Sequence, residues 1–235
     1  MTGLASLPMY DWPEVRAEVD DFFAHLRDAV PELPEGLARL ETEPDLDAHW
    51  RDPALLLSQT CWGPMRLGLA PPVEVLAQPS YDDVPGGRAT LYRSAIVMRD
   101  GEVVPPHTTA DAIIPKGTGG LRPAISGPKS LSGALSLAED LADPGLPGRA
   151  LVTGSHRASI RAIAGDRADF AAIDCRSWAL ALAHEPAARR LTVVGWTALR
   201  PGLPFITSRR TPPGLRSRLA AALMALGALQ PAIAA

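Results

Sequence analysis

Residues 151–175 constrain the fold of this chain most, because they predict a strand, a helix and a second strand in immediate succession. The segment reads LVTGSHRASIRAIAGDRADFAAIDC. Residues 151–153 form a short apolar run typical of a strand. Ser155 follows as a helix N-cap, since its hydroxyl can accept from the unpaired amides of a first turn.

The helix and the second strand complete this unit. Apolar residues recur at helical spacing on one face, and Gly165 is expected to end the helix in the left-handed conformation. Residues 170–173 are apolar throughout, as in a strand covered on both faces. His156 and Asp174 come directly after the two predicted strands. In open α/β sheets, ligands bind beyond the C-terminal strand ends.

The remaining sequence repeats this alternation of strands and helices. It predicts an α/β fold with mainly parallel sheets flanked by helices. We expect further strands over residues 4–9, 37–41, 55–60, 73–78, 91–98, 121–126, 191–197 and 203–207. We expect helices starting at Asp11, at Leu46, after Gly133, at Arg176 and at Thr211, and a loop over residues 105–120.

Composition excludes several classes of protein. With 46% hydrophobic and 21% charged residues among 235, the chain is globular, and a net charge of -3 without a basic run argues against a nucleic-acid partner. Cys61 and Cys175 form no metal or disulfide motif and are expected to be buried free thiols. No segment reaches the roughly 18 apolar residues of a membrane helix. The N-terminal residues do not resemble a secretory signal, so we expect a cytoplasmic protein, or a periplasmic one whose leader was removed.

The turn GPKSLSG is one candidate ligand site. Ser130, Ser132 and Gly133 offer hydroxyls and backbone amides at a predicted strand-to-helix turn, which suits an anion. Lys129 at a helix start also makes more sense with an anion nearby. The alternative is an ordinary helix cap.

Other polar residues follow predicted strand ends. His156 could donate to an oxyanion or simply open its helix. Asp174 could bind a ligand amine or cap the next helix. Four less specific candidates could line a pocket or only pack: Tyr10, Gln59, Thr60 and Tyr92.

These segments together resemble a known family, the phosphate/phosphite/phosphonate-type substrate-binding proteins of ABC transporters, which have a type II periplasmic-binding-protein fold. The resemblance covers most of the chain. The similar segments are LASLPMYDWPE, LLLSQTCW, LYRSAIVM, TGSHRASIRAIAGDRADFAAIDC and GLPFITS.

The resemblance implies two lobes with a ligand cleft between them. Lobe I would hold residues 1–93 plus 194–235, and lobe II residues 94–193, with crossing strands near residues 92–97 and 191–197. A Ser/Thr-Ser-Gly turn in the family grips the oxyanion, and Ser130, Ser132 and Gly133 match it. Leu131 replaces a hydroxyl residue often found within that turn. The family histidine matches His156, the acidic group matches Asp174, and Tyr10, Gln59, Thr60 and Tyr92 match wall positions.

The function implied is binding of a small phosphate- or phosphonate-like oxyanion, with an ABC permease as partner and no cofactor. Two alternatives remain. One is a cytoplasmic ligand sensor or partner-binding domain of the same fold. The other is an enzyme that uses Cys61 or Ser155 with His156 and Asp174 as nucleophile, base and acid. That arrangement is disfavoured because neighbouring Ser155 and His156 should point apart.

Overall fold

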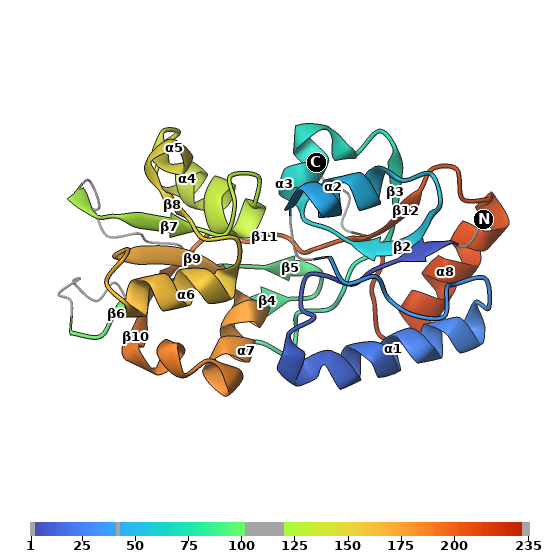
Figure 1. Cartoon of the computed structure of the whole chain (residues 1–235), viewed down its shortest axis with the longest axis horizontal. Coiled ribbons are helices and arrows are strands. Elements are labelled where there is room, and N and C mark those ends of the chain that lie inside the picture. The colour runs from blue at the N-terminus through green and yellow to red at the C-terminus, as the bar shows by residue number, and fades with distance from the viewer. Residues whose placement is uncertain (1–2, 41–42, 102–119, 232–235) are drawn as a thin grey trace. The chain divides into compact units, whose positions relative to one another are not determined.

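The structure is a computed structural model that describes residues 3–40, 43–101 and 120–231. The chain falls into two compact units (Figure 1). The first unit combines Met1–Ser80 with Pro201–Ala235, and the second is Tyr81–Arg200. The predicted loop over residues 105–120 lies outside the described residues except at its end.

The first unit contains a four-stranded mixed sheet in the order β1-β2-β12-β3. The strands are β1 (Leu4–Ala5), β2 (Leu55–Gln59), β3 (Val73–Ala77) and β12 (Phe205–Ser208). β1 runs parallel to β2, whereas β12 is antiparallel to both of its neighbours. The helical segments are η1 (Pro13–Val15), α1 (Arg16–Ala29), α2 (Glu43–Arg51), α3 (Trp62–Pro64), η2 (Met65–Leu69) and α8 (Pro213–Ala225).

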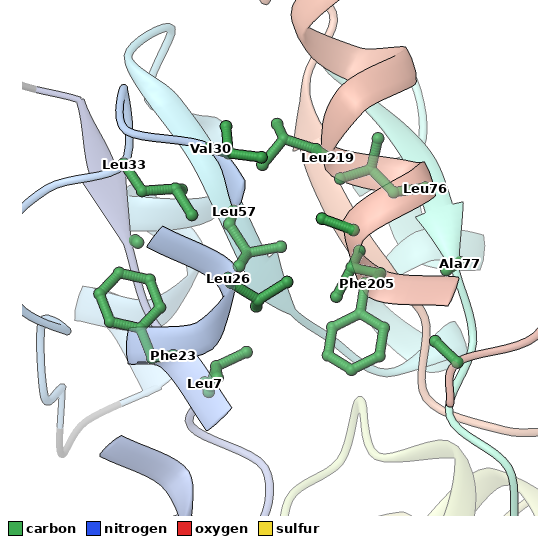
Figure 2. Packing of buried hydrophobic residues seen from close by; sticks show 14 residues of the cluster. Leu7, Phe23, Leu26, Val30, Leu33, Leu57, Leu76, Ala77, Phe205 and Leu219 are labelled. Carbon is green, nitrogen blue, oxygen red and sulfur yellow. The ribbon is translucent and has the colours of Figure 1, made fainter. Parts of the chain in front are cut away.

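Apolar side chains cover this sheet on both faces. On one face, Leu57 and Phe205 pack with Leu26 of α1 and Leu219 of α8 (Figure 2). On the other face, Ile206 packs with Trp50, Met65 and Leu69. Phe205 and Ile206 are neighbours in β12 and therefore serve opposite faces, as the two-residue period of a strand requires.

The second unit contains a five-stranded sheet in the order β10-β6-β9-β7-β8. β7 pairs in parallel with β8 and β9, while β6 is antiparallel to β9 and β10. The strands are β6 (Ser94–Arg99), β7 (Pro123–Ile125), β8 (Leu151–Val152), β9 (Phe170–Asp174) and β10 (Leu191–Trp196). Two short strands, β4 (Gly87–Arg88) and β5 (Leu91–Tyr92), pair antiparallel. In β11 (Arg200–Pro201), the chain passes from the second unit back to the first.

Helices pack against this second sheet. They are η4 (Leu131–Leu135), α4 (Ser136–Asp140), α5 (Leu146–Arg149), α6 (His156–Ala164), α7 (Cys175–His184) and η5 (Pro186–Arg190). Ala134, Leu137 and Leu146 pack on Ile96 and Phe170 of the sheet. The predicted α/β class is confirmed, although the sheets are mixed rather than mainly parallel because β6, β10 and β12 run against their neighbours.

Several local predictions need correction. Gly165 has an ordinary φ of -92°, and Asp166 adopts the left-handed conformation instead, with φ 59°. Asp11 does not cap a helix; its carboxylate accepts from Arg39 Nε at 2.8 Å. Residues 37–40 form no strand, although Ala38 N donates to Ala5 O at 2.8 Å, and the first strand is limited to β1.

The chain changes unit between Ser80 and Tyr81 and again between Arg200 and Pro201. The segments expected to cross between lobes, residues 92–97 and 191–197, lie within the second unit. The predicted lobe limits and a ligand cleft between them stay predictions.

Candidate functional site

The Ser130–Gly133 turn follows β7 and starts η4. Ser130 has extended backbone angles, and its Oγ accepts from Gly133 N at 3.0 Å. This is the geometry of a serine N-cap. The Ser130 hydroxyl and the Gly133 amide are thus paired with each other, so the ordinary cap that the sequence left open is present.

Position 133 requires a glycine because neighbouring side chains approach its backbone closely. A Cβ atom on this residue would meet Ser126 Oγ first, and it would lie 3.2 Å from both His156 Cε1 and Ser130 Oγ. The missing side chain therefore lets the histidine ring reach the turn.

His156 opens α6 and lies between two polar side chains. Its Nε2 atom is 2.9 Å from Ser132 Oγ and 3.3 Å from Asp174 Oδ2. Ser132 Oγ is in turn 3.4 Å from Ser130 Oγ. Ser130, Ser132, Gly133, His156 and Asp174 therefore form one cluster, which we call the turn cluster.

Burial shapes the chemistry of the histidine. It lowers the pKa of His156 from its ordinary value of 6.5, while the Asp174 carboxylate and the Ala172 backbone act in the opposite direction. The neutral ring is thus favoured in the absence of a ligand. A negative charge placed beside it would favour the imidazolium form.

Asp174 ends β9 and also caps α7. Its Oδ1 accepts from Ser177 N at 3.0 Å, while Oδ2 faces His156. The side chain is almost fully buried. Its helix-capping role is therefore observed, and a role toward a ligand stays a prediction.

The other sequence-predicted site residues lie elsewhere. Lys129 is exposed just ahead of the turn. Tyr92 is buried in the second unit, where its ring stacks on Tyr81 with centroids 5.4 Å apart. Tyr10, Gln59 and Thr60 belong to the first unit, where Gln59 and Thr60 are buried at the end of β2.

Sequence reasoning missed Ser94 and Ser126, which also lie at the turn cluster. Ser94 is the cross-strand partner of Asp174, and Ser126 approaches Gly133. Both lie inside predicted strands, where a polar residue is not interpreted as a site candidate. No signal in the sequence distinguishes Ser94 within its predicted strand, because the direction of that strand depends on tertiary pairing.

The geometry does not form a nucleophile, base and acid set. In such a set the nucleophile and the acid contact different ring nitrogens, whereas Ser132 and Asp174 both approach Nε2. Ser155 Oγ accepts from Ala158 N as a helix cap. Both cysteines are buried thiols that form no disulfide, and burial raises the pKa of the Cys175 thiol to about 12.

The described residues contain no group of side chains suited to hold a metal ion. Among the same residues, no helix has the length and apolar character needed to cross a bilayer.

Solved structures with the same fold define the class of this protein. PhnD1 from Prochlorococcus marinus in complex with methylphosphonate matches with a TM-score of 0.68 at 17% identity, covering 94% of this chain and 83% of that one. A binding protein component of an ABC phosphonate transporter from Pseudomonas aeruginosa matches with a TM-score of 0.66 at 15% identity, covering 93% and 72%. A histidine kinase sensor domain matches with a TM-score of 0.65 at 13% identity, covering 97% and 98%. The chain thus has a type II periplasmic-binding-protein fold, which is shared by transport and sensor proteins.

The family is shown by a sequence model. Residues 65–234 match the model of the ABC transporter phosphonate periplasmic substrate-binding protein. The chain therefore belongs to this family of solute-binding proteins, as the sequence resemblance predicted. No curated protein matches the sequence.

Proposed function

We propose that this protein binds a small phosphate- or phosphonate-like oxyanion at the turn cluster and presents it to an ABC permease. Membership of the phosphonate substrate-binding family supports a solute-binding role and a transport partner. The observation that carries the choice of ligand is the approach of Ser132 Oγ and His156 Nε2 to 2.9 Å, beside the Ser130 hydroxyl. Two hydroxyls and an imidazole at one point can donate to several oxygens of one anion.

The proposed binding mode uses these side chains as donors rather than the Gly133 amide, which Ser130 already occupies. Oxyanion binding would draw a proton onto His156, and the positive charge of the ring would then attract both the anion and the Asp174 carboxylate, which faces the same Nε2 atom. Asp174 would also accept from any proton-bearing group of the ligand. Lys129 would add long-range attraction from the surface.

The first unit would contribute the opposite wall. We propose Tyr10, Gln59 and Thr60 for this wall, with Tyr92 beside the turn cluster, and closure of two lobes around the ligand. The Thr60 hydroxyl is buried and has no hydrogen-bond partner in the described part of the chain. It is therefore available for a ligand oxygen. Lobe I would comprise residues 1–93 plus 194–235, and lobe II residues 94–193.

No chemical step is part of this proposal. The ligand is held and released unchanged, because the hydroxyl and carboxylate share one ring nitrogen and the Cys175 thiol is kept protonated by burial.

Isothermal titration calorimetry against methylphosphonate, phosphite, phosphate and sulfate tests the proposal. We expect saturable binding of at least one phosphorus oxyanion. Ser132→Ala should weaken it about 10- to 100-fold, since a hydrogen bond to a charged group contributes about 1.5–3 kcal/mol.

Ser217→Ala is the matched control, because that exposed hydroxyl donates to Pro213 O within α8. Its affinity should equal that of the wild type. Absence of binding across the three phosphorus oxyanions would contradict the proposed ligand class.

A further inference from the structure

Ser94 carries a buried hydroxyl that has no partner in the described part of the fold. The residue begins β6, is 1% exposed, and its Oγ makes no hydrogen bond within the described residues. A buried hydroxyl without a partner keeps its full desolvation cost, so such groups are rare unless something else satisfies them. Because none of the described residues satisfies this hydroxyl, its place is open to a water molecule or a ligand.

The register places this hydroxyl next to Asp174. Ser94 pairs directly with Asp174 across β6 and β9. Cys175 N donates to Arg93 O at 3.0 Å, which lies one residue beyond each member of the pair. Ser94 and Asp174 are therefore a non-hydrogen-bonded pair, in which side chains stand closest, with Cβ atoms about 4.5–5.5 Å apart on one face.

Thr197 binds the Ser94 backbone on the side of β6 that faces away from β9. Its amide donates to Thr197 Oγ1 at 2.8 Å, and its carbonyl accepts from Thr197 N at 2.9 Å. The backbone of Ser94 thus has its partners, whereas the side-chain hydroxyl has none among the residues that the structure describes. It extends the row of polar side chains that runs from Ser132 through His156 to Asp174.

We propose that Ser94 is a specificity-determining ligand contact, which together with Asp174 takes a hydroxyl group of the bound oxyanion. A hydroxyl can donate to the Asp174 carboxylate and accept from Ser94 Oγ at the same time. A bare oxyanion oxygen at this place would be repelled by Asp174. The ligand class is therefore a protonated oxyanion, such as the P–OH form of a monoanionic phosphonate or phosphate. This inference rests on the proposed function of the turn cluster.

Ser94→Ala tests the proposal by separating stability from binding. Removing a hydroxyl without a partner should leave the melting temperature of the ligand-free protein unchanged or raise it. Calorimetry with methylphosphonate at about pH 6.5, where the ligand keeps a proton, should show an affinity about 5- to 30-fold weaker than that of the wild type.

Ser159→Ala is the matched control within the same unit. Ser159 is equally buried, but its Oγ lies 2.7 Å from Thr153 Oγ1 and is thus satisfied. This variant should melt at a lower temperature and keep the wild-type affinity.

The outcomes separate this inference from the proposed function. If the wild type binds and Ser94→Ala binds equally well, the hydroxyl is held by water and the inference is wrong. A lower melting temperature of Ser94→Ala with unchanged affinity would assign it a structural role and also overturn the inference. If the wild type binds no phosphorus oxyanion, the proposed function itself fails, and the inference with it.

Discussion

His156 is the residue whose environment most directly links structure to solution behaviour. The ring contacts Ser132 and Asp174 and its side chain is only 14% exposed, and this partial burial lowers its pKa below the ordinary value of 6.5. Between these two pKa values the unfolded chain binds more protons than the folded protein. The free energy of unfolding therefore rises with pH in this window and falls as the pH drops below about 6.5.

We expect the melting temperature of the ligand-free wild type to decrease as the pH is lowered from about 7.5 to about 5.5. The variant His156→Gln should show a weaker dependence of the melting temperature on pH. Part of the dependence should remain, because burial also lowers the pKa of His49. Differential scanning calorimetry across this range measures the effect. A variant with the same slope as the wild type would show that His156 is not buried in its neutral form. Exchange of the exposed His25 for Gln is the control.

At the scale of elements, three adjacent parallel strands explain why the sequence identified much of the turn cluster. β8, β7 and β9 lie side by side, and their C-terminal ends lead to His156, Ser130 and Asp174. The C-terminal ends of parallel strands meet at one edge of the sheet. The predicted strands alone therefore indicated that these residues lie close together. The sequence analysis did not identify Ser94, because β6 is antiparallel to β9 and its first residue, not its last, lies at this edge of the sheet. Strand direction depends on tertiary pairing, which sequence periodicity does not reveal.

Helix and strand limits were less predictable for the same physical reason. Asp11 and Gly165 have side-chain types that suit helix ends, but Asp11 pairs with Arg39, which is distant in sequence. Asp166 follows Gly165 in the left-handed conformation despite its side chain. Tertiary contacts override local preference at such positions.

An ion-pair group connects the same strands at their other ends. Asp169 accepts from Arg99 Nη2 at 3.1 Å, from Arg122 Nη2 at 2.7 Å and from Arg122 N at 2.6 Å. Arg99 also donates to the carbonyls of Ile163 and Ala168. The group therefore joins the end of β6, the starts of β7 and β9, and the C-terminal end of α6.

We expect Asp169→Asn to lower the free energy of unfolding by about 2–4 kcal/mol, because it removes the buried carboxylate that Arg99 and Arg122 share and leaves them only the exposed Asp166 as an acidic partner among the described residues. The arginines hold the pKa of Asp169 well below its usual 3.8. Its stabilising effect is thus complete above about pH 4 and is lost as the pH falls further. Urea unfolding at neutral pH measures the change.

Methylphosphonate affinity is the internal control for this variant, since the turn cluster lies at the other ends of β7 and β9. The affinity should not change. Wild-type stability of Asp169→Asn would contradict this division of roles. Loss of methylphosphonate binding in a folded Asp169→Asn protein would contradict it as well.

At the scale of the whole molecule, the fold persists with little sequence identity. The matched structures cover 93–97% of this chain at 13–17% identity. The family model begins at Met65 and thus includes the turn cluster but not Tyr10, Gln59 or Thr60. The sequence predicted the fold class, and it named second-unit residues that the structure brings together in the turn cluster. Their role toward a ligand, and a wall from the first unit, stay predictions.

The proposed closure of two lobes can be measured directly. Small-angle X-ray scattering should show a smaller radius of gyration when saturating methylphosphonate is added, because closing a hinge brings mass toward the centre. Ser132→Ala at the same ligand concentration should respond less. An unchanged radius of gyration in a wild-type protein that calorimetry shows to be saturated would exclude closure while leaving binding intact.

The most direct test of the central claim is a crystal structure of the protein with methylphosphonate. The account predicts phosphonate oxygens within hydrogen-bonding distance, about 2.7–3.2 Å, of Ser132 Oγ and His156 Nε2. A phosphonate bound away from both atoms, or a turn cluster that stays closed upon itself in a ligand-saturated crystal, would contradict it.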